Sequence, residues 1–391
     1  MHHREALGLA DVDETTLTDL VAASFGEPSD RVTVIDSYAE RVAYDLPAIT
    51  TAGRFWVRGS ALVGQRRRKF CFFVKHVQSF SRSPLFAGVP AEIAVMAEAS
   101  VPWRTEPLVY RSDLGDRLPL GLRMPRAFGV FDLDESSASL WLEAIPALKV
   151  QWDEARFAGA AYLLGRLAAS PAVHERARVG EVDRTVRDYF DGRLTHQVVP
   201  SLRDPGTWDH SLMAEAFDDS LRNQLLREAD QAEDLVAELA ALPLGTIHGD
   251  ACPNNLLTTS EVGGFVLIDY GFFGAGPIGF DLGQLLVGDI QIGRQPASSL
   301  QHVEDVILPA YIEGLRAEGL ELPLDVVRRA HALHLMLFTG LSIPLFEHVG
   351  DDRGTALHHE AAERACIARF CLDLLAATEP AVNRTGGPPR A

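Results

Sequence analysis

The chain has 391 residues, two to three times the commonest domain size, so we expect one large or two medium domains. Hydrophobic residues make up 47% and charged residues 23%, a composition that is typical of a folded globular protein and excludes a disordered chain. Thirty-six Lys and Arg residues stand against 54 Asp and Glu residues, giving a net charge of −18. This charge argues against a nucleic-acid partner and favours cationic or neutral partners.

No membrane or export signal is expected. The longest apolar stretch, residues 335–346, is interrupted by polar residues and a proline and is too short to span a bilayer. The N-terminal stretch turns acidic where a signal peptide would have its apolar core. The four cysteines form no C-x-x-C pair, which fits a reducing compartment. We therefore expect a cytoplasmic protein without a membrane partner.

The first 150 residues read as one helix followed by a sheet. Residues 14–25 have the pattern of an amphipathic helix, with Asp13 as the N-cap and Gly26 as the closing residue. From about 31 to 148, short runs of β-branched and aromatic residues alternate with turn-like stretches, which predicts a mostly antiparallel sheet. Its one predicted helix covers roughly residues 103–114.

Helical periodicity dominates from residue 151 onward. Two β-like runs interrupt it, at 245–257 and 265–268, and three further helices are predicted near 300–318, 324–346 and 355–376. The Pro- and Gly-rich end should be disordered. We therefore predict an N-terminal domain over 1–145, a C-terminal domain over 146–376 and a disordered tail over 377–391.

The two β-like runs hold the most informative residues. They read T-I-H-G-D-A-C-P-N-N-L-L over 246–257 and F-V-L-I-D-Y-G over 265–271, so Asp250, Asn255 and Asp269 lie at the ends of short apolar segments. Such an oxygen-only set suits Mg²⁺, which takes one or two carboxylates and completes its shell with water and phosphate oxygens. Asn255 and Asp269 can hold the metal, while Asp250 takes a proton from an incoming hydroxyl.

The pattern H-G-D-x-x-x-x-N followed by I-D-x-G resembles the catalytic signature of the aminoglycoside phosphotransferase family, small-molecule relatives of protein kinases. The resemblance implies an α+β, bilobal protein-kinase-like fold, with an N-terminal antiparallel sheet lobe and a larger, mostly helical C-terminal lobe. It makes Asp250 the catalytic base and Asn255 and Asp269 the Mg²⁺ ligands, with His248 packing behind the loop. It also makes Asp281, in P-I-G-F-D-L, the residue that braces the loop.

A kinase-like lobe needs a strand cation for the phosphates and a helix carboxylate to hold that cation. Lys75 ends the apolar run K-F-C-F-F-V-K, an unfavourable place for an ammonium without a partner, although it could also snorkel to water from the strand end. Glu106, in W-R-T-E-P-L-V-Y-R-S, is the preferred carboxylate because it resembles the corresponding helix of the family. Glu92 and Glu98 are its competitors.

The phosphate loop departs from the family pattern, because residues 57–64 hold no G-x-G-x-x-G. Members of the family often use a serine-bearing loop there, so Ser60 is the candidate. The run L-W-L-E-A-I over 140–145 resembles the strand and hinge that bind adenine. We expect the backbone from Glu143 to Ile145 to supply the donor and the acceptor.

Other patterns have less specific interpretations. A literal G-x-G-x-x-G over 274–279 lacks the βαβ context of a dinucleotide site, and the basic run 66–69 reads as a solvated hairpin turn. The histidines at 331, 334, 358 and 359 are more simply packing or surface residues than zinc ligands. The acidic stretch 204–238 could steer a cationic substrate or could be a solvated helical face.

The resulting hypothesis is a phosphotransferase that uses Mg²⁺ and ATP or GTP to phosphorylate a hydroxyl of a small molecule, such as an aminoglycoside or another antibiotic. Asp281 lies only twelve positions after Asp269, which leaves no room for the peptide platform of a protein kinase. Two alternatives stay open. One is a metabolic kinase of the choline, homoserine or sugar type, and the other is a non-catalytic pseudokinase, which the presence of Lys75, Asp250, Asn255 and Asp269 disfavours.

Overall fold

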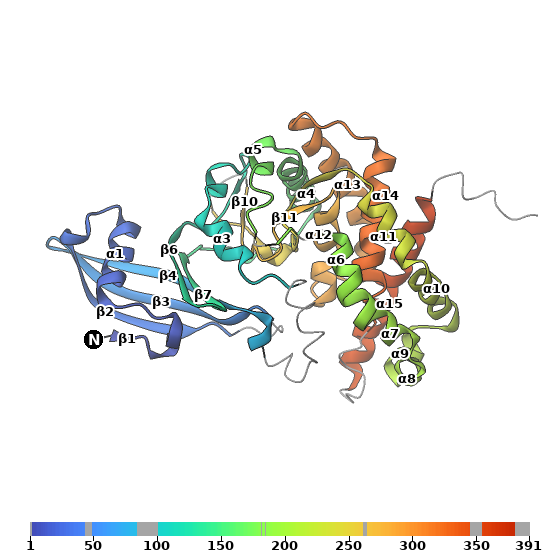
Figure 1. Cartoon of the computed structure of the whole chain (residues 1–391), viewed down its shortest axis with the longest axis horizontal. Helices are drawn as coiled ribbons and strands as arrows, with labels where there is room; N and C mark the ends of the chain where they lie inside the picture. The colour runs from blue at the N-terminus through green and yellow to red at the C-terminus, as the bar shows by residue number, and fades with distance from the viewer. Residues whose placement is uncertain are drawn as a thin grey trace, which may run out of the picture. The chain divides into compact units, whose positions relative to one another are not determined.

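The computed structural model describes residues 2–43, 49–83, 101–180, 182–183, 185–260, 264–344 and 354–379 (Figure 1). The chain forms two compact units, each assembled from several segments. The first comprises residues 1–149, 178–182 and 257–273, and the second comprises 150–177, 183–256 and 274–391. The domain limits at 145 and 376 stay predictions. The residues from 380 onward, where most of the predicted disordered tail falls, lie outside the described residues.

The first unit is built mainly from strands. Its elements are β1 (His2–His3), η1 (Glu5–Ala10), α1 (Glu14–Phe25), η2 (Ser29–Arg31), β2 (Val32–Arg41), β3 (Thr51–Val63), β4 (Arg66–Gln78), η3 (Phe80–Arg82), α3 (Thr105–Arg111), η5 (Leu114–Asp116), β5 (Leu122–Arg123), β6 (Ala127–Asp134), β7 (Ser137–Glu143) and β10 (Phe265–Leu267). The predicted helices at 14–25 and within 103–114 are therefore confirmed as α1 and α3. Asp13 caps α1 by accepting a hydrogen bond from the Thr16 N–H, and Gly26 ends the helix in the left-handed conformation.

Among the described residues, six strands form the main sheet in the order β1-β2-β3-β4-β7-β6. All neighbours pair antiparallel except β1 and β2, so the predicted antiparallel sheet is confirmed. Helix α1 covers one face of this sheet (Figure 1). On that face Leu17 and Val21 of the helix and Phe72 and Val74 of β4 are completely buried in one apolar core.

Successive side chains of a strand point to opposite faces, so β4 presents two different surfaces. Phe70, Phe72 and Val74 face the α1 core, while Lys75 points to the opposite face. The register pairs Lys75 with Arg54 of β3, which places these two side chains on that same second face. This face, rather than the apolar core, is where the sheet can bind a polar ligand.

The second unit is mostly helical, as predicted. Its elements are α4 (Glu154–Ala169), α5 (Pro171–His174), α6 (Val186–Tyr189), η6 (Phe190–Val198), α7 (Val199–Arg203), α8 (Pro205–Asp209), α9 (Ser211–Ala216), α10 (Asp219–Asp230), α11 (Ala232–Ala240), β8 (Leu244–Ile247), η7 (Pro253–Asn255), β11 (Gly274–Pro277), α12 (Phe280–Gln291), η8 (Ala297–Ser299), α13 (Leu300–Ala317), α14 (Leu324–Leu335), η9 (Met336–Gly340) and α15 (Gly354–Ala377). The short strand β9 (Leu256–Leu257) follows η7 along the chain.

Helices α4 and α13 approach each other very closely, and glycines make this possible. A Cβ atom on Gly165 of α4 would lie 2.1 Å from the Tyr311 carbonyl oxygen, and one on Gly314 of α13 would lie 2.0 Å from the Tyr162 carbonyl oxygen. Any side chain at either position would therefore push the helix backbones apart. The two glycines thus allow the backbones of α4 and α13 to lie in direct contact.

The literal G-x-G-x-x-G over 274–279 has no role as a dinucleotide-binding turn. Residues Gly274–Pro277 form strand β11, which pairs antiparallel with β8. A dinucleotide fingerprint instead requires a parallel strand–turn–helix unit.

None of the helices that the structure describes is both long enough and apolar enough to cross a membrane.

Candidate functional site

The candidate site of the first unit is a buried cluster around Lys75. Its Nζ atom lies 2.5 Å from Oε2 of Glu106 on α3 and 2.9 Å from Oδ1 of Asp269, and it donates a hydrogen bond to each oxygen. The Lys75 and Glu106 side chains are only 6% and 4% exposed, whereas Asp269 is 37% exposed. The structure therefore brings together three of the predicted residues. Glu92 and Glu98, the competing carboxylates, lie outside the described residues.

The electrostatics of the cluster keep Lys75 charged. Burial alone would lower its pKa, but the Asp269 and Glu106 carboxylates raise the pKa of Lys75 above its ordinary value. Burial raises the pKa of Glu106, and the Lys75 charge opposes that rise. Removing Lys75 would leave two neighbouring carboxylates without a cation, whereas removing one carboxylate would leave a single ion pair.

Helix α3 and the segment after β10 are fixed to each other by aromatic packing. Tyr110 lies one helical turn after Glu106, and its ring meets the Tyr270 ring edge-on at a centroid distance of 5.9 Å. Asp269, the residue before Tyr270, has a φ of 66°, the left-handed conformation that short polar side chains tolerate. This backbone conformation and the aromatic contact together hold the Asp269 carboxylate beside Lys75.

The candidate site of the second unit is the H-G-D loop after β8. Asp281, at the start of α12, accepts hydrogen bonds from the backbone N–H groups of His248 and Gly249, both at 2.8 Å. Gly249 has a φ of 86°, a conformation that favours glycine. Burial raises the pKa of Asp281 to about 6, against the two hydrogen bonds, which lower it. The predicted bracing of the loop by Asp281 is thus confirmed, and His248 is completely buried behind it.

Asp250 and Asn255 contact each other within this loop. The Asn255 Nδ2 atom donates to the Asp250 backbone oxygen at 2.8 Å and to the Asp250 Oδ2 atom at 2.9 Å. Neither bond uses the Asn255 oxygen Oδ1, so this oxygen is oriented apart from Asp250 and suits a cation. Asp269, the other predicted Mg²⁺ ligand, belongs to the first unit and carries a half-exposed carboxylate. Each of the two side chains offers the kind of oxygen donor that Mg²⁺ prefers, and their joint role as its ligands stays a prediction.

The predicted hinge ends strand β7. The Glu143 carboxylate accepts hydrogen bonds from Arg123 Nη1 and from the Arg126 backbone N–H, both at 3.1 Å. The Glu143 backbone N–H is itself used, because it donates to the Arg126 carbonyl at 2.8 Å. Within the predicted hinge, a backbone donor for a nucleotide base would therefore have to come from Ala144 or Ile145.

Ser60, the predicted phosphate-loop residue, is not brought to the Lys75 cluster. It lies inside β3, where its hydroxyl donates to Asp36 Oδ2 at 2.7 Å. Ser60 pairs with Lys69, whereas Lys75 pairs with Arg54, six positions or about 20 Å along the strand. Lys75 pairs near the start of β3, where the chain arrives from β2, whereas residues 57–64 lie toward the opposite end of β3, at the turn to β4. Residues 57–64 therefore do not form the loop beside this lysine. We leave Ser60 out of the proposed site.

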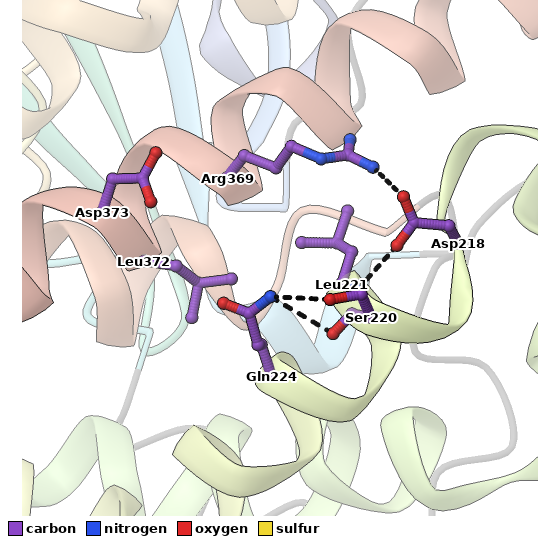
Figure 2. A pocket seen from close by; sticks show the side chains of 7 residues that line it. All are labelled: Asp218, Ser220, Leu221, Gln224, Arg369, Leu372 and Asp373. Carbon is purple, nitrogen blue, oxygen red and sulfur yellow. Dashed lines mark hydrogen bonds and ion pairs between the residues drawn. The ribbon is translucent and has the colours of Figure 1, made fainter.

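Five of the ten acidic residues in the stretch 204–238 contact basic side chains of the second unit. The pairs are Asp218–Arg369, Asp230–Arg203, Glu233–Arg187, Glu215–His358 and Glu238–Arg329. Figure 2 shows the first pair beside a pocket that is lined by residues of α10 and α15. Asp218 Oδ2 lies 2.6 Å from Arg369 Nη2. This pairing favours a solvated helical face over a surface that steers cations.

The histidines do not form a zinc site. His331 and His334 are buried in α14, where His334 packs against Phe280 at a centroid distance of 3.9 Å. His358 instead pairs with Glu215. Over the described ranges, no group of three or more His, Cys, Asp or Glu side chains is arranged to hold a metal ion.

A strand lysine held by a helix carboxylate, in a chain that also carries a braced H-G-D-x-x-x-x-N loop, defines a phosphotransferase of the protein-kinase-like class. The model of the phosphotransferase enzyme family, the aminoglycoside phosphotransferase (APH) group, matches residues 119–315, half of the chain. The chain belongs to this family. Its fold is α+β and bilobal protein-kinase-like, with an antiparallel sheet lobe and a mostly helical lobe, as predicted.

Solved structures show similarities of low sequence identity. Amicoumacin kinase hAmiN, in complex with AMP-PNP, Ca²⁺ and Ami, has a TM-score of 0.46 and 16% identity, with 89% of each chain covered. Aminoglycoside phosphotransferase APH(3'')-Id from Streptomyces rimosus, with ADP and streptomycin, has a TM-score of 0.41 and 20% identity over 83% of this chain and 98% of that chain. Plasmodium vivax ethanolamine kinase has a TM-score of 0.46 and 10% identity over 90% and 85%. The comparison with curated protein sequences gave no match.

Proposed function

We propose that this protein transfers the γ-phosphoryl group of ATP or GTP to a hydroxyl group of a small molecule. The observation that carries the proposal is the buried Lys75, paired at once with Glu106 and Asp269. An ammonium fixed in this way is suited to hold nucleotide phosphates in one position, and phosphoryl transfer depends mainly on positioning and charge stabilisation.

Within this proposal, Asp250 is the base that accepts the proton of the attacking hydroxyl. The hydrogen bond from Asn255 orients its carboxylate, and Asp281 holds the backbone of the loop. Asn255 and Asp269 would hold Mg²⁺, which supplies positive charge to the phosphate oxygens when bound. The backbone of Ile145 would bind the nucleotide base.

The chemical class of the acceptor is inferred from the family and from one feature of the chain. The short interval between Asp269 and Asp281 contains strand β11 and leaves no segment for a peptide platform. We therefore infer a small-molecule acceptor, either an antibiotic such as an aminoglycoside or a metabolite of the choline, homoserine or sugar type.

The test is an acceptor screen with the purified chain, Mg²⁺ and either ATP or GTP. Aminoglycosides, nucleoside antibiotics, amino alcohols and sugars are incubated in parallel, and mass spectrometry detects one added phosphoryl group on the acceptor. Asp250→Ala is the matched control for a contaminating kinase. Nucleotide binding without transfer to any acceptor or to water would favour the pseudokinase alternative.

A further inference from the structure

The Lys75 cluster carries an imbalance of charge. One ammonium pairs with two carboxylates, so these three side chains together bear one net negative charge. A nucleoside triphosphate is strongly anionic, and a site that is itself negative would repel it at short range. Lys75 is already paired with both carboxylates, so a further cation beside the proposed Mg²⁺ would favour the binding of phosphate groups.

Arg54 is the cation that the sheet places beside this cluster. It is directly opposite Lys75 in the antiparallel register of β3 and β4, so the two side chains project from the same face of the sheet. Side chains directly opposite each other in such a pair have Cβ atoms about 5 Å apart. Burial raises the pKa of Glu106, and the positive charge of Arg54, together with that of Lys75, opposes this rise.

Arg54 differs from Lys75 in its exposure. Lys75 is buried, whereas Arg54 is only half-buried and can reach a ligand that approaches this face. Its planar guanidinium can donate two parallel hydrogen bonds to a phosphate group, a geometry that an ammonium cannot offer.

We propose that Arg54 is a second phosphate-binding residue of the nucleotide site, acting beside Lys75 on the same face of the sheet. This inference rests on the proposed function. Arg54 balances the charge of the cluster and binds phosphate oxygens, while Lys75 serves as the buried anchor. The ligand class is a nucleoside di- or triphosphate, and the unphosphorylated nucleoside would gain nothing from Arg54.

The experiment measures the affinity of the full chain for AMP-PNP, ADP and adenosine by calorimetry, with GMP-PNP, GDP and guanosine as the second series. Arg54→Gln should weaken binding of AMP-PNP about tenfold or more, weaken ADP similarly or less, and leave adenosine unchanged. Arg54→Lys retains the charge and should lose less than Arg54→Gln. It also serves as the second variant if Arg54→Gln is unstable.

Arg58→Gln is the matched control. Arg58 lies on the same strand and the same face, four positions away, and its Nη1 atom pairs with Glu40 at 2.7 Å. Removing this charge should leave the AMP-PNP affinity close to that of the unmodified chain. An equal loss in Arg58→Gln would show general attraction only and would overturn the assignment of Arg54.

Three further results would overturn the inference. The first is an unchanged AMP-PNP affinity in Arg54→Gln, and the second is an equal loss of adenosine affinity in the same variant. The third is that Arg54→Gln no longer weakens AMP-PNP binding when Glu106→Gln is also present, because Arg54 would then act only through Glu106. If the unmodified chain binds no nucleotide, the proposed function itself fails. Nucleotide binding that is unaffected by Arg54→Gln overturns this inference alone.

Discussion

The Nζ atom of Lys75 lies 2.5 Å from Oε2 of Glu106, although the two residues are 31 positions apart and belong to different elements. Both side chains are almost fully buried, so water cannot compensate the Glu106 charge if Lys75 is removed, and Lys75 retains only Asp269 if Glu106 is removed. We therefore expect the pair to act as one unit, both in holding α3 to the sheet and in the proposed positioning of phosphate groups.

This coupling can be measured with a double-mutant cycle. Lys75→Met retains the volume of the lysine stem in β4 but removes its charge, and Glu106→Gln removes the charge of its partner. Each single change should lower kcat/KM strongly, and the double variant should lose much less than the sum, with a coupling energy of about 1–3 kcal/mol. Additive losses in kcat/KM would contradict a joint role.

Asp250 is expected to act in the chemical step. Asp250→Ala should lower kcat about 10²- to 10⁴-fold while the nucleotide affinity changes little, because the side chain acts on the acceptor proton. Single-turnover kinetics with a productive acceptor, combined with calorimetry for the nucleotide, check the two halves of this prediction. Near-normal turnover in a folded Asp250→Ala variant would remove the base assignment.

Substitution of the proposed metal ligands should change the Mg²⁺ dependence of the activity. Asp269→Asn and Asn255→Ala each remove an oxygen donor or a charge from a site with few protein ligands, so each should raise the Mg²⁺ concentration needed for half-maximal activity. High Mg²⁺ should restore part of the activity. An unchanged Mg²⁺ titration in both variants would exclude this ligand pair.

The sequence predicted these residues because their signals are local. Asp250, Asn255 and Asp269 belong to short motifs, and Lys75 is a charge at the end of an apolar run, so each is recognisable without knowledge of the fold. The partner Glu106 came from resemblance of its helix to the family. Such signals depend on a few neighbouring positions, which is why a single sequence suffices for them.

Ser60 and Arg54 show where the sequence was insufficient. Both lie on β3, and only the register of β3 against β4 decides which of them is opposite Lys75. Register depends on long-range pairing that neither strand reveals alone. The strand β11 was missed for a related reason, because its residues Gly274–Pro277 have little intrinsic strand propensity and adopt the strand by pairing with β8.

Asp281 predicts a pH-dependent stability. Its pKa is raised by burial to about 6 in the folded chain, compared with an ordinary value of 3.8, so the folded state binds the proton more tightly than the unfolded state. Stability contributed by this group is therefore lost as the pH rises, and the loss is complete above pH 6. Relative to Asp281→Asn, the unmodified chain should lose about 2 kcal/mol of unfolding free energy between pH 4.5 and 7.

Denaturant unfolding of both proteins across this range checks the difference, since the other titrating groups are common to both. Asp281→Asn should also lower activity, because an amide can accept only one of the hydrogen bonds from His248 and Gly249. A difference in stability that does not change with pH would show that Asp281 is ionised throughout.

The close crossing of α4 and α13 predicts how glycine substitutions change the stability of the chain. Gly165→Ala places a Cβ atom within 2.1 Å of the Tyr311 carbonyl, so the helices must separate, and we expect a loss of about 1–3 kcal/mol of unfolding free energy. Gly159→Ala on the same helix is the matched control, because nothing lies within 4 Å of its added Cβ atom. That variant should be neutral or up to about 1 kcal/mol more stable, because alanine favours the helix over glycine. Equal effects of the two substitutions on the unfolding midpoint would show that α4 and α13 do not make this close contact.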